Sequence, residues 1–223
     1  MSAPQHTSPA SAATPRDAAS TAGPKRRSTA TDLAQVAVFA ALIAALGLPG
    51  ALYLGGTAVP ITFQTLGVML AGAILGARKG FLAVLLFLAL VAAGLPLLSG
   101  GRGGISVFVG PSVGYLLGWL LGAALIGWAT ARLLPAYRIL PALAWTALGG
   151  IVAVYLVGVP VFAAITGTPL GVAIAGSAIF LPGDLAKVVV TVFVAKGVHR
   201  AWPGLIAPRS WPWKRDAAAT PAA

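Results

Sequence analysis

The sequence predicts an all-α integral membrane protein with six transmembrane helices and both termini on the cytoplasmic side. Of its 223 residues, 58% are hydrophobic and only 9% are charged. A soluble domain usually carries about 25% charged residues, because its surface must be wetted. The apolar residues form long runs separated by short polar or basic stretches. A membrane span needs about 20 apolar residues, so this pattern excludes a soluble protein.

The first three spans are predicted at 32–48, 60–77 and 80–95. The first has Thr31 or Asp32 available as an N-cap, because both side chains can accept a hydrogen bond from the first helical turn. The second opens near Pro60, a residue that suits the start of a helix. The third stops at Pro96, since proline cannot continue the hydrogen-bond pattern of a helix.

The last three spans are predicted at 111–134, 141–165 and 184–199. The sixth is short, at 16 residues, and follows the stretch GVAIAGSAIFLPG. That stretch is too short to cross a bilayer alone, which indicates a loop or re-entrant piece packed on protein. The loops expected to form a lid on the outer side are 49–59, 96–110 and 166–183.

The basic residues indicate the orientation of the chain. With the N-terminus inside, 13 of the 15 Lys and Arg residues fall in inner segments, and only Arg102 and Lys187 fall in the outer half. Cytoplasmic loops of membrane proteins carry such an excess of positive charge, so the net charge of +11 does not indicate nucleic-acid binding. The predicted organisation is a disordered cytoplasmic tail over 1–30, a membrane domain over 31–200 and a basic cytoplasmic tail over 201–223.

Three charged residues are the candidate binding groups. Asp184 is the only acidic residue between Asp32 and Asp216, and Lys187 follows it by three positions, which puts both on one helix face. Charged side chains inside a membrane are costly and usually functional, although a structural ion pair between helices is the alternative. Asp184 follows Pro-Gly and could cap the sixth helix while facing the outer cavity. Arg102 lies among four glycines in an outer loop and offers a guanidinium suited to a carboxylate.

Neutral side chains could complete a site for a small anion that carries N–H groups. Hydrogen-bonding side chains at the start of the second span are Thr62, Gln64 and Thr65, and aromatic candidates for an apolar wall are Tyr53, Phe108, Tyr115 and Trp119. The chain has no cysteine and two histidines, which argues against a metal centre. It also lacks a phosphate-binding G-x-x-x-x-G-K-[ST] loop and the common hydrolase motifs. Any ATP hydrolysis would therefore come from a partner chain, and no cofactor is expected.

Small residues recur at every fourth position in three sets. They are Ala37, Ala41 and Ala45; Gly72, Gly76 and Gly80; and Gly114, Gly118 and Gly122. Such ridges let helix backbones approach closely in a membrane. For the glycine ridges, packing inside this chain is the favoured interpretation, while the alanine ridge is less decisive because alanine is common throughout the sequence.

Three segments, VPITFQTLGVMLAGAILGARKG, GLPLLSGGRGGISVFVGPSVGYLLGW and LPGDLAKVVV, resemble the signature stretches of the BioY family. Members of that family are biotin-binding S components of energy-coupling-factor (ECF) vitamin transporters. The resemblance extends over about residues 33–200 and implies a six-helix S-component bundle that captures biotin from outside. It also implies a membrane T component and two cytoplasmic ATPases as partners.

The resemblance also implies roles for individual residues. The binding arginine corresponds to Arg102, the acid and base of the G-D-x-x-K motif to Asp184 and Lys187, and the docking face for the T component to Ala37, Ala41 and Ala45. Biotin's ureido ring offers N–H donors to Asp184, and either base could take its carboxylate. Alternatives are an S component for another small vitamin, a membrane-embedded enzyme that uses Asp184, and a structural membrane scaffold without a ligand.

Overall fold

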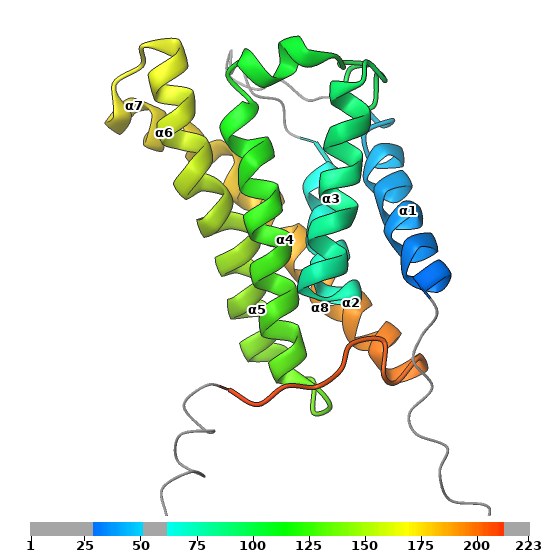
Figure 1. The fold of residues 1–223 in the computed structure, drawn as a ribbon. Helices are drawn as coiled ribbons and strands as arrows, with labels where there is room; N and C mark the ends of the chain where they lie inside the picture. Colours follow the sequence, from blue (N-terminus) through cyan, green and yellow to red (C-terminus); the bar gives the residue numbers. More distant parts are fainter. Residues whose placement is uncertain (1–28, 51–61, 212–223) are drawn as a thin grey trace, which may run out of the picture.

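The computed structural model describes residues 29–50 and 62–211, which form a bundle of helices (Figure 1). Among these residues there is no β-strand, and an isolated bridge joins Leu98 to Arg102. The α-helices are α1 (Thr29–Ala45), α2 (Gln64–Leu75), α3 (Ala77–Ala92), α4 (Val113–Leu133), α5 (Ile139–Ala147), α6 (Val154–Thr166), α7 (Leu170–Ser177) and α8 (Leu181–Ala201). Short η1 (Ile105–Val109), η2 (Leu148–Ala153) and η3 (Ala178–Phe180) complete the set.

All six predicted spans contain helix. Helices α1 to α4 correspond to the first four spans, although 51–61, with Pro60, lie outside the described residues. Helices α5, η2 and α6 form one continuous helix of 28 residues, and α7, η3 and α8 form another of 32 residues. Together with the 21 residues of α4, these helices are long and apolar enough to cross a membrane, while α1 and α2 are shorter apolar helices.

The prediction of a loop over 166–183 is wrong, because the chain is helical again from Leu170. The short 3₁₀ segment η3 joins α7 to α8, and Pro182 falls within the first turn of α8. Proline is tolerated there because the backbone N–H that it lacks would have no partner within the helix. The apolar stretch before the sixth span therefore extends that span.

Both predicted N-caps are also wrong. Helix α8 begins at Leu181, so Asp184 lies inside the helix and its carboxylate is not a cap. Helix α1 already includes Thr29, and Asp32 in its first turn forms an ion pair with Lys79 of α3, with 3.1 Å between Oδ1 and Nζ. The positive end of a helix dipole stabilises a carboxylate in the first helical turn. Asp32 and Asp184 both lie in such a turn.

The glycine ridges bring helices into close contact, as predicted. A Cβ atom added at Gly118 would lie 2.9 Å from the backbone of Val154, and one at Gly122 would lie 2.6 Å from the carbonyl oxygen of Gly149. A Cβ at Gly80 would approach the backbone of α2 to 2.9 Å. Any larger residue at these positions would push α4 away from α6, or α3 away from α2, because backbone cannot yield as a flexible side chain can.

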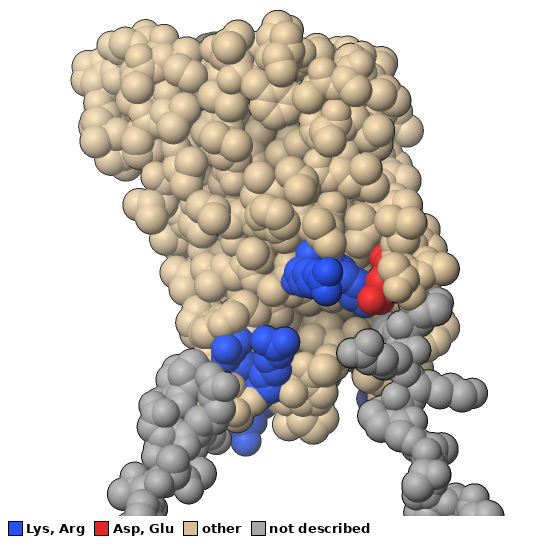
Figure 2. All heavy atoms as spheres, viewed as in Figure 1, with Lys and Arg blue, Asp and Glu red and all other residues tan. Residues whose placement is uncertain are grey.

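The core has two layers along the bundle. Phe87, Trp119 and Tyr115 belong to the layer nearer the outer loops, while Met69 and Ile126 belong to the layer below it. On the face drawn in Figure 2, the Lys, Arg and Asp atoms gather towards the lower end and the upper half carries none. The outer layer is the one from which α4 and α6 contribute side chains to the cavity described below.

The segment 202–211, here called the C-terminal strap, packs across the lower end of the bundle (Figure 1) and belongs to the stretch 201–223 that is predicted to be a basic cytoplasmic tail. Ile206 is buried against Gly76 at the turn between α2 and α3. The backbone N–H of Arg209 donates to Ala131 of α4 at 2.7 Å. The strap therefore connects the end of α8 to three other helices.

Trp211 ends the strap in an aromatic cluster. Its ring stacks on Trp145 of α5 with centroids 5.6 Å apart and meets the ring of Trp128 of α4 edge-on at the same distance. The Arg132 guanidinium lies 3.7 Å from the centroid of Trp128. Aromatic pairs and cation–π contacts each contribute about 0.5–2 kcal/mol, so this cluster anchors the strap.

A Trp211→Ala variant is expected to lose about 1–3 kcal/mol of stability, because it removes both ring contacts of the strap. The measurement is the temperature at which detergent-solubilised protein ceases to be monodisperse. Trp202→Ala is the matched control, since Trp202 lies in the same segment and is 68% exposed. Equal losses in both variants would contradict an anchoring role for Trp211.

Candidate functional site

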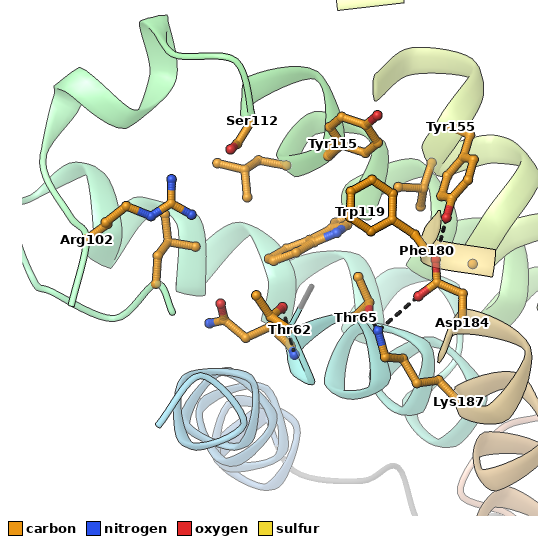
Figure 3. A pocket seen from close by; sticks show the side chains of 15 residues that line it. Thr62, Thr65, Arg102, Ser112, Tyr115, Trp119, Tyr155, Phe180, Asp184 and Lys187 are labelled. Atoms are coloured by element: carbon orange, nitrogen blue, oxygen red, sulfur yellow. Dashed lines mark hydrogen bonds and ion pairs between the residues drawn. The ribbon is translucent and has the colours of Figure 1, made fainter. Parts of the chain in front are cut away.

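A cavity opens between α2, α4, α6, α8 and the loop before η1, with a free volume of about 70 Å³. Its walls include the three charged candidates, Arg102, Asp184 and Lys187, together with Gln64 and Tyr115 from the neutral candidates. Two bases and one acid line it, so its charge is positive by one unit. In Figure 3, Arg102 and Ser112 lie at one end and the Asp184–Lys187 pair lies at the other.

The deep end of the cavity is a hydrogen-bonded network around Asp184. Lys187 Nζ donates to Asp184 Oδ1 at 2.9 Å and to Thr65 Oγ1 at 2.8 Å. The Tyr155 hydroxyl donates to Asp184 Oδ2 at 2.7 Å. Asp184 and Lys187 are 5% and 7% exposed, and a buried ion pair is tolerated only when further hydrogen bonds satisfy it. The network meets this need with groups from α2 and α6.

The other end of the cavity is formed by a tight turn that carries Arg102. Leu98 and Arg102 exchange backbone hydrogen bonds of 3.0 and 3.2 Å. Between them, Gly100 and Gly101 have φ angles of +80° and +71°, which residues with a Cβ rarely adopt. Arg102 Nε donates to the carbonyl oxygen of Ser99 at 3.3 Å, longer than a typical hydrogen bond. The glycines therefore give this turn a defined shape that presents the guanidinium at the rim.

Gln64 supports the turn. Its Nε2 donates to the carbonyl oxygens of Ile43 and Leu97 at 3.3 and 3.0 Å, and its Oε1 accepts from the Ser99 N–H at 3.0 Å. The side chain is 1% exposed. Both amide donors and the carbonyl oxygen are thus engaged in the protein, so Gln64 acts on the cavity by holding the turn in place. Direct hydrogen bonding to a ligand, proposed from the sequence, is not favoured by this geometry.

Aromatic rings form the wall between the two ends. Tyr115 meets Tyr155 edge-on at a centroid distance of 6.2 Å and Phe180 at 6.5 Å. The Tyr115 hydroxyl is hydrogen-bonded to Ser177 Oγ at 3.2 Å. Trp119 lines the cavity as predicted, whereas Phe108 does not, and Tyr53 lies outside the described residues. Small-molecule sites commonly combine such an apolar wall with a few fixed polar groups.

Comparison with known proteins identifies the family. The model of the BioY family matches residues 19–204. The chain belongs to the BioY family. It is 44% identical to the biotin transporter BioY of Rhizobium etli, over 77% of this chain and 95% of that protein. It is 46% identical to the biotin transporter BioY of Rhodobacter capsulatus, over 78% of this chain and 96% of that protein.

A solved BioY-like structure has the same fold. A crystal structure of the S component for biotin from an ECF-type ABC transporter superposes with a TM-score of 0.74 at 34% identity, covering 79% of this chain and 94% of that chain. The resemblance noted from three sequence segments is therefore confirmed, and the chain is a multi-pass membrane protein with the helical bundle of an S component.

Sequence reasoning missed Tyr155, which belongs to the site of this BioY family member. Tyr155 hydrogen-bonds to Asp184 and lines the cavity. A signal was present, because Tyr155 is the only residue with a polar side chain in 147–165. An isolated polar group in a membrane helix needs a partner, and the buried acid of the sixth span was the candidate. Phe180, which also lines the cavity, carried no such signal.

Proposed function

We propose that this chain captures biotin at the outer face of the cell membrane and serves as the substrate-binding subunit of an ECF-type transporter. The observation that carries the proposal is the cavity of a BioY family member with a buried acid at one end and a guanidinium at the other. Biotin has ureido N–H donors at one end and a carboxylate at the other. Its two polar ends therefore match the two polar ends of the cavity.

The charges favour one orientation of the ligand. Lys187 is already neutralised by Asp184 at 2.9 Å, so adding a carboxylate beside it would bring two anions to one cation. The Arg102 side chain forms a long hydrogen bond to Ser99, has no ion-pair partner among the described residues and can form a bidentate pair with a carboxylate. We therefore assign the biotin carboxylate to Arg102 and the ureido N–H groups to Asp184.

The function is tested by calorimetric titration of the purified chain with biotin and with a panel of other vitamins, together with mass spectrometry of any co-purified molecule. Among the vitamins tested, only biotin is expected to bind. The bound biotin should be recovered chemically unchanged. Preference for a different vitamin would assign the chain to another substrate. Conversion of the ligand would favour a membrane-embedded enzyme, and the absence of any ligand would favour a scaffold.

A Tyr155→Phe variant is expected to weaken biotin binding about tenfold or more, because a hydrogen bond to a charged group contributes about 1.5–3 kcal/mol. The loss leaves Asp184 Oδ2 without its donor and lets the carboxylate turn away from the ligand. Titration calorimetry measures the effect. Tyr115→Phe is the control, since that hydroxyl contacts the neutral Ser177 and should matter less. A larger effect at Tyr115 would argue against the role of Tyr155.

Both termini are proposed to lie in the cytoplasm. The support is the division of basic residues, 13 inner and 2 outer, together with the strap, which lies at the end of the bundle opposite the segment between α3 and α4 (Figure 1). The chain has no cysteine, so single cysteines can be labelled cleanly. Ile105→Cys should react with an impermeant maleimide on intact cells, and Ser210→Cys only after lysis. The reverse pattern would invert the topology.

The proposed partners are a membrane T component and two cytoplasmic ATPases. The proposal is supported by the alanine ridge of α1, because Ala37, Ala41 and Ala45 are all exposed on the outside of the bundle. Helix α1 packs against α2 and α3 through other residues, such as Ala40 and Ile43. A face of small residues directed at lipid is suited to close contact with a helix of another protein.

A further inference from the structure

A second hollow lies on the outer side of the bundle, next to the cavity. It is bounded by Gly101 to Gly103 on one side and by residues between Ser106 and Ser112 on the other, and its free volume is about 370 Å³. We call it the outer hollow. The turn that carries Arg102 forms one of its walls and η1 forms the other.

The outer hollow and the cavity share two side chains, Arg102 and Ser112, which line both. Arg102 is half-buried and Ser112 is 6% exposed. Arg102 therefore lies where the two spaces meet, and Figure 3 shows it at the same end of the cavity as Ser112. A group bound to Arg102 from the outer hollow could pass into the cavity without leaving that side chain.

The chemistry of the outer hollow suits a carboxylate. Arg102 is the only charged residue between 95 and 112, and Ser106 and Ser112 add hydroxyl donors. The hydrogen bond from the guanidinium to the Ser99 carbonyl oxygen is long, at 3.3 Å. Little binding energy is therefore lost when the Arg102 side chain turns towards a ligand. An isolated positive charge at a mouth attracts anions and raises their rate of association.

We infer that the outer hollow is an entry station, in which the ligand's carboxylate binds Arg102 before the ring system enters the cavity. The inference rests on the proposed capture of biotin and adds the order of events. Arg102 first holds the carboxylate from the outer hollow. The ring then moves past Ser112 towards Asp184, while the same guanidinium keeps the carboxylate.

Filling the outer hollow tests the inference. Ser106→Trp is suitable because Ser106 lines the outer hollow and not the cavity. Ile105→Trp is the matched control, since Ile105 is its neighbour, is 72% exposed and lines neither space. Association and dissociation of labelled biotin are measured by rapid filtration of purified protein. In Ser106→Trp, association and dissociation are both expected to slow by about tenfold, because the new ring raises the barrier between the free and bound states. The dissociation constant should stay unchanged, since neither of those states is altered.

A second arm compares biotin with its neutral amide. Arg102→Gln should slow the association of biotin more than that of the amide, and raised salt should reduce the difference, because steering acts only on the charged ligand. Equal slowing of both ligands would overturn the role of Arg102 in entry. This arm does not depend on the folding of the Ser106 variant.

The outcomes separate the inference from the proposed function. Unchanged rates in Ser106→Trp would overturn the entry station alone. A weakened dissociation constant with an unchanged association rate would also overturn it, since the hollow would then belong to the final site. Absence of biotin binding to the unmodified protein would overturn the proposed function, and the inference with it.

Discussion

An Asp184→Asn variant is expected to lose high-affinity biotin binding while it still folds in detergent. Asparagine keeps the size of the side chain but removes the charge that accepts from Tyr155 and pairs with Lys187. Removing one partner of a buried ion pair typically costs about 3–5 kcal/mol, because the other charge is left uncompensated. A hydrogen bond to a charged group contributes about 1.5–3 kcal/mol, so losing the charge that would accept both ureido N–H groups is expected to weaken biotin binding about 100-fold or more. Titration calorimetry gives the affinity, and Lys187→Ala should have a comparable effect.

Two controls distinguish a binding site from a structural ion pair. Asp32→Asn removes the other described ion pair, which joins Asp32 to Lys79 away from the cavity, and should leave binding unchanged. The double variant Asp184→Asn with Lys187→Met removes both buried charges and should fold, because no charge is left unpaired. It should not bind biotin. Normal affinity in the double variant would mean that the pair is only structural.

An Ala41→Trp variant is expected to abolish biotin uptake by cells while the purified protein binds biotin with normal affinity. Ala41 is at the centre of the exposed alanine ridge of α1 and lines no wall of the cavity. A large ring there would prevent the close approach of a partner helix, on which association in membranes depends. Uptake of labelled biotin by cells that express the complete transporter, compared with binding to the isolated chain, measures the two effects.

The control for the docking face is Leu156→Trp. Leu156 is 74% exposed on α6, which lies on the opposite side of the bundle from α1 in Figure 1, so this variant adds a ring to the lipid-facing surface without touching the alanine ridge. It should transport normally. Loss of both binding and uptake in Ala41→Trp, or equal loss of uptake in both variants, would show that the ridge of α1 is not a specific docking face.

Composition and charge pattern predicted the fold well, for a physical reason. In a bilayer the backbone N–H and C=O groups have no water to bond with, so a long apolar run must form a helix. The six spans were identified on that basis, and the glycine ridges of α2 to α4 indicated close packing that the structure confirms. The stretch GVAIAGSAIFLPG is too short to cross a bilayer alone, which predicts that it lies outside the sixth span, but in the structure it extends that helix. The predicted sixth span begins after Pro182, although the first turn of a helix accepts proline.

The strap and the support of the cavity were not predictable in the same way. Segment 202–211 contains two prolines and no apolar run long enough for a span, and contacts with distant helices hold it in place. The sequence predicts Gln64 as a ligand-binding group because no neighbour in the sequence is an evident hydrogen-bond partner for its side-chain amide. In the structure that amide bonds to residues 21 to 35 positions away. Sequence spacing carries no information on such contacts.

The sequence alone determines the membrane class, the six helical spans and the family resemblance. It also identifies the three charged side chains, because a charge inside a membrane is costly and therefore rare. The folded bundle adds which of these charges are already paired. Lys187 reaches Asp184 within one helical turn but also Thr65, 122 residues away, and Tyr155 reaches Asp184 across 29 residues. Such distances depend on how helices pack against one another. For this reason only the tertiary structure shows that Arg102, at one end of the cavity, has no ion-pair partner among the described residues, whereas Asp184 and Lys187, at the other end, neutralise each other.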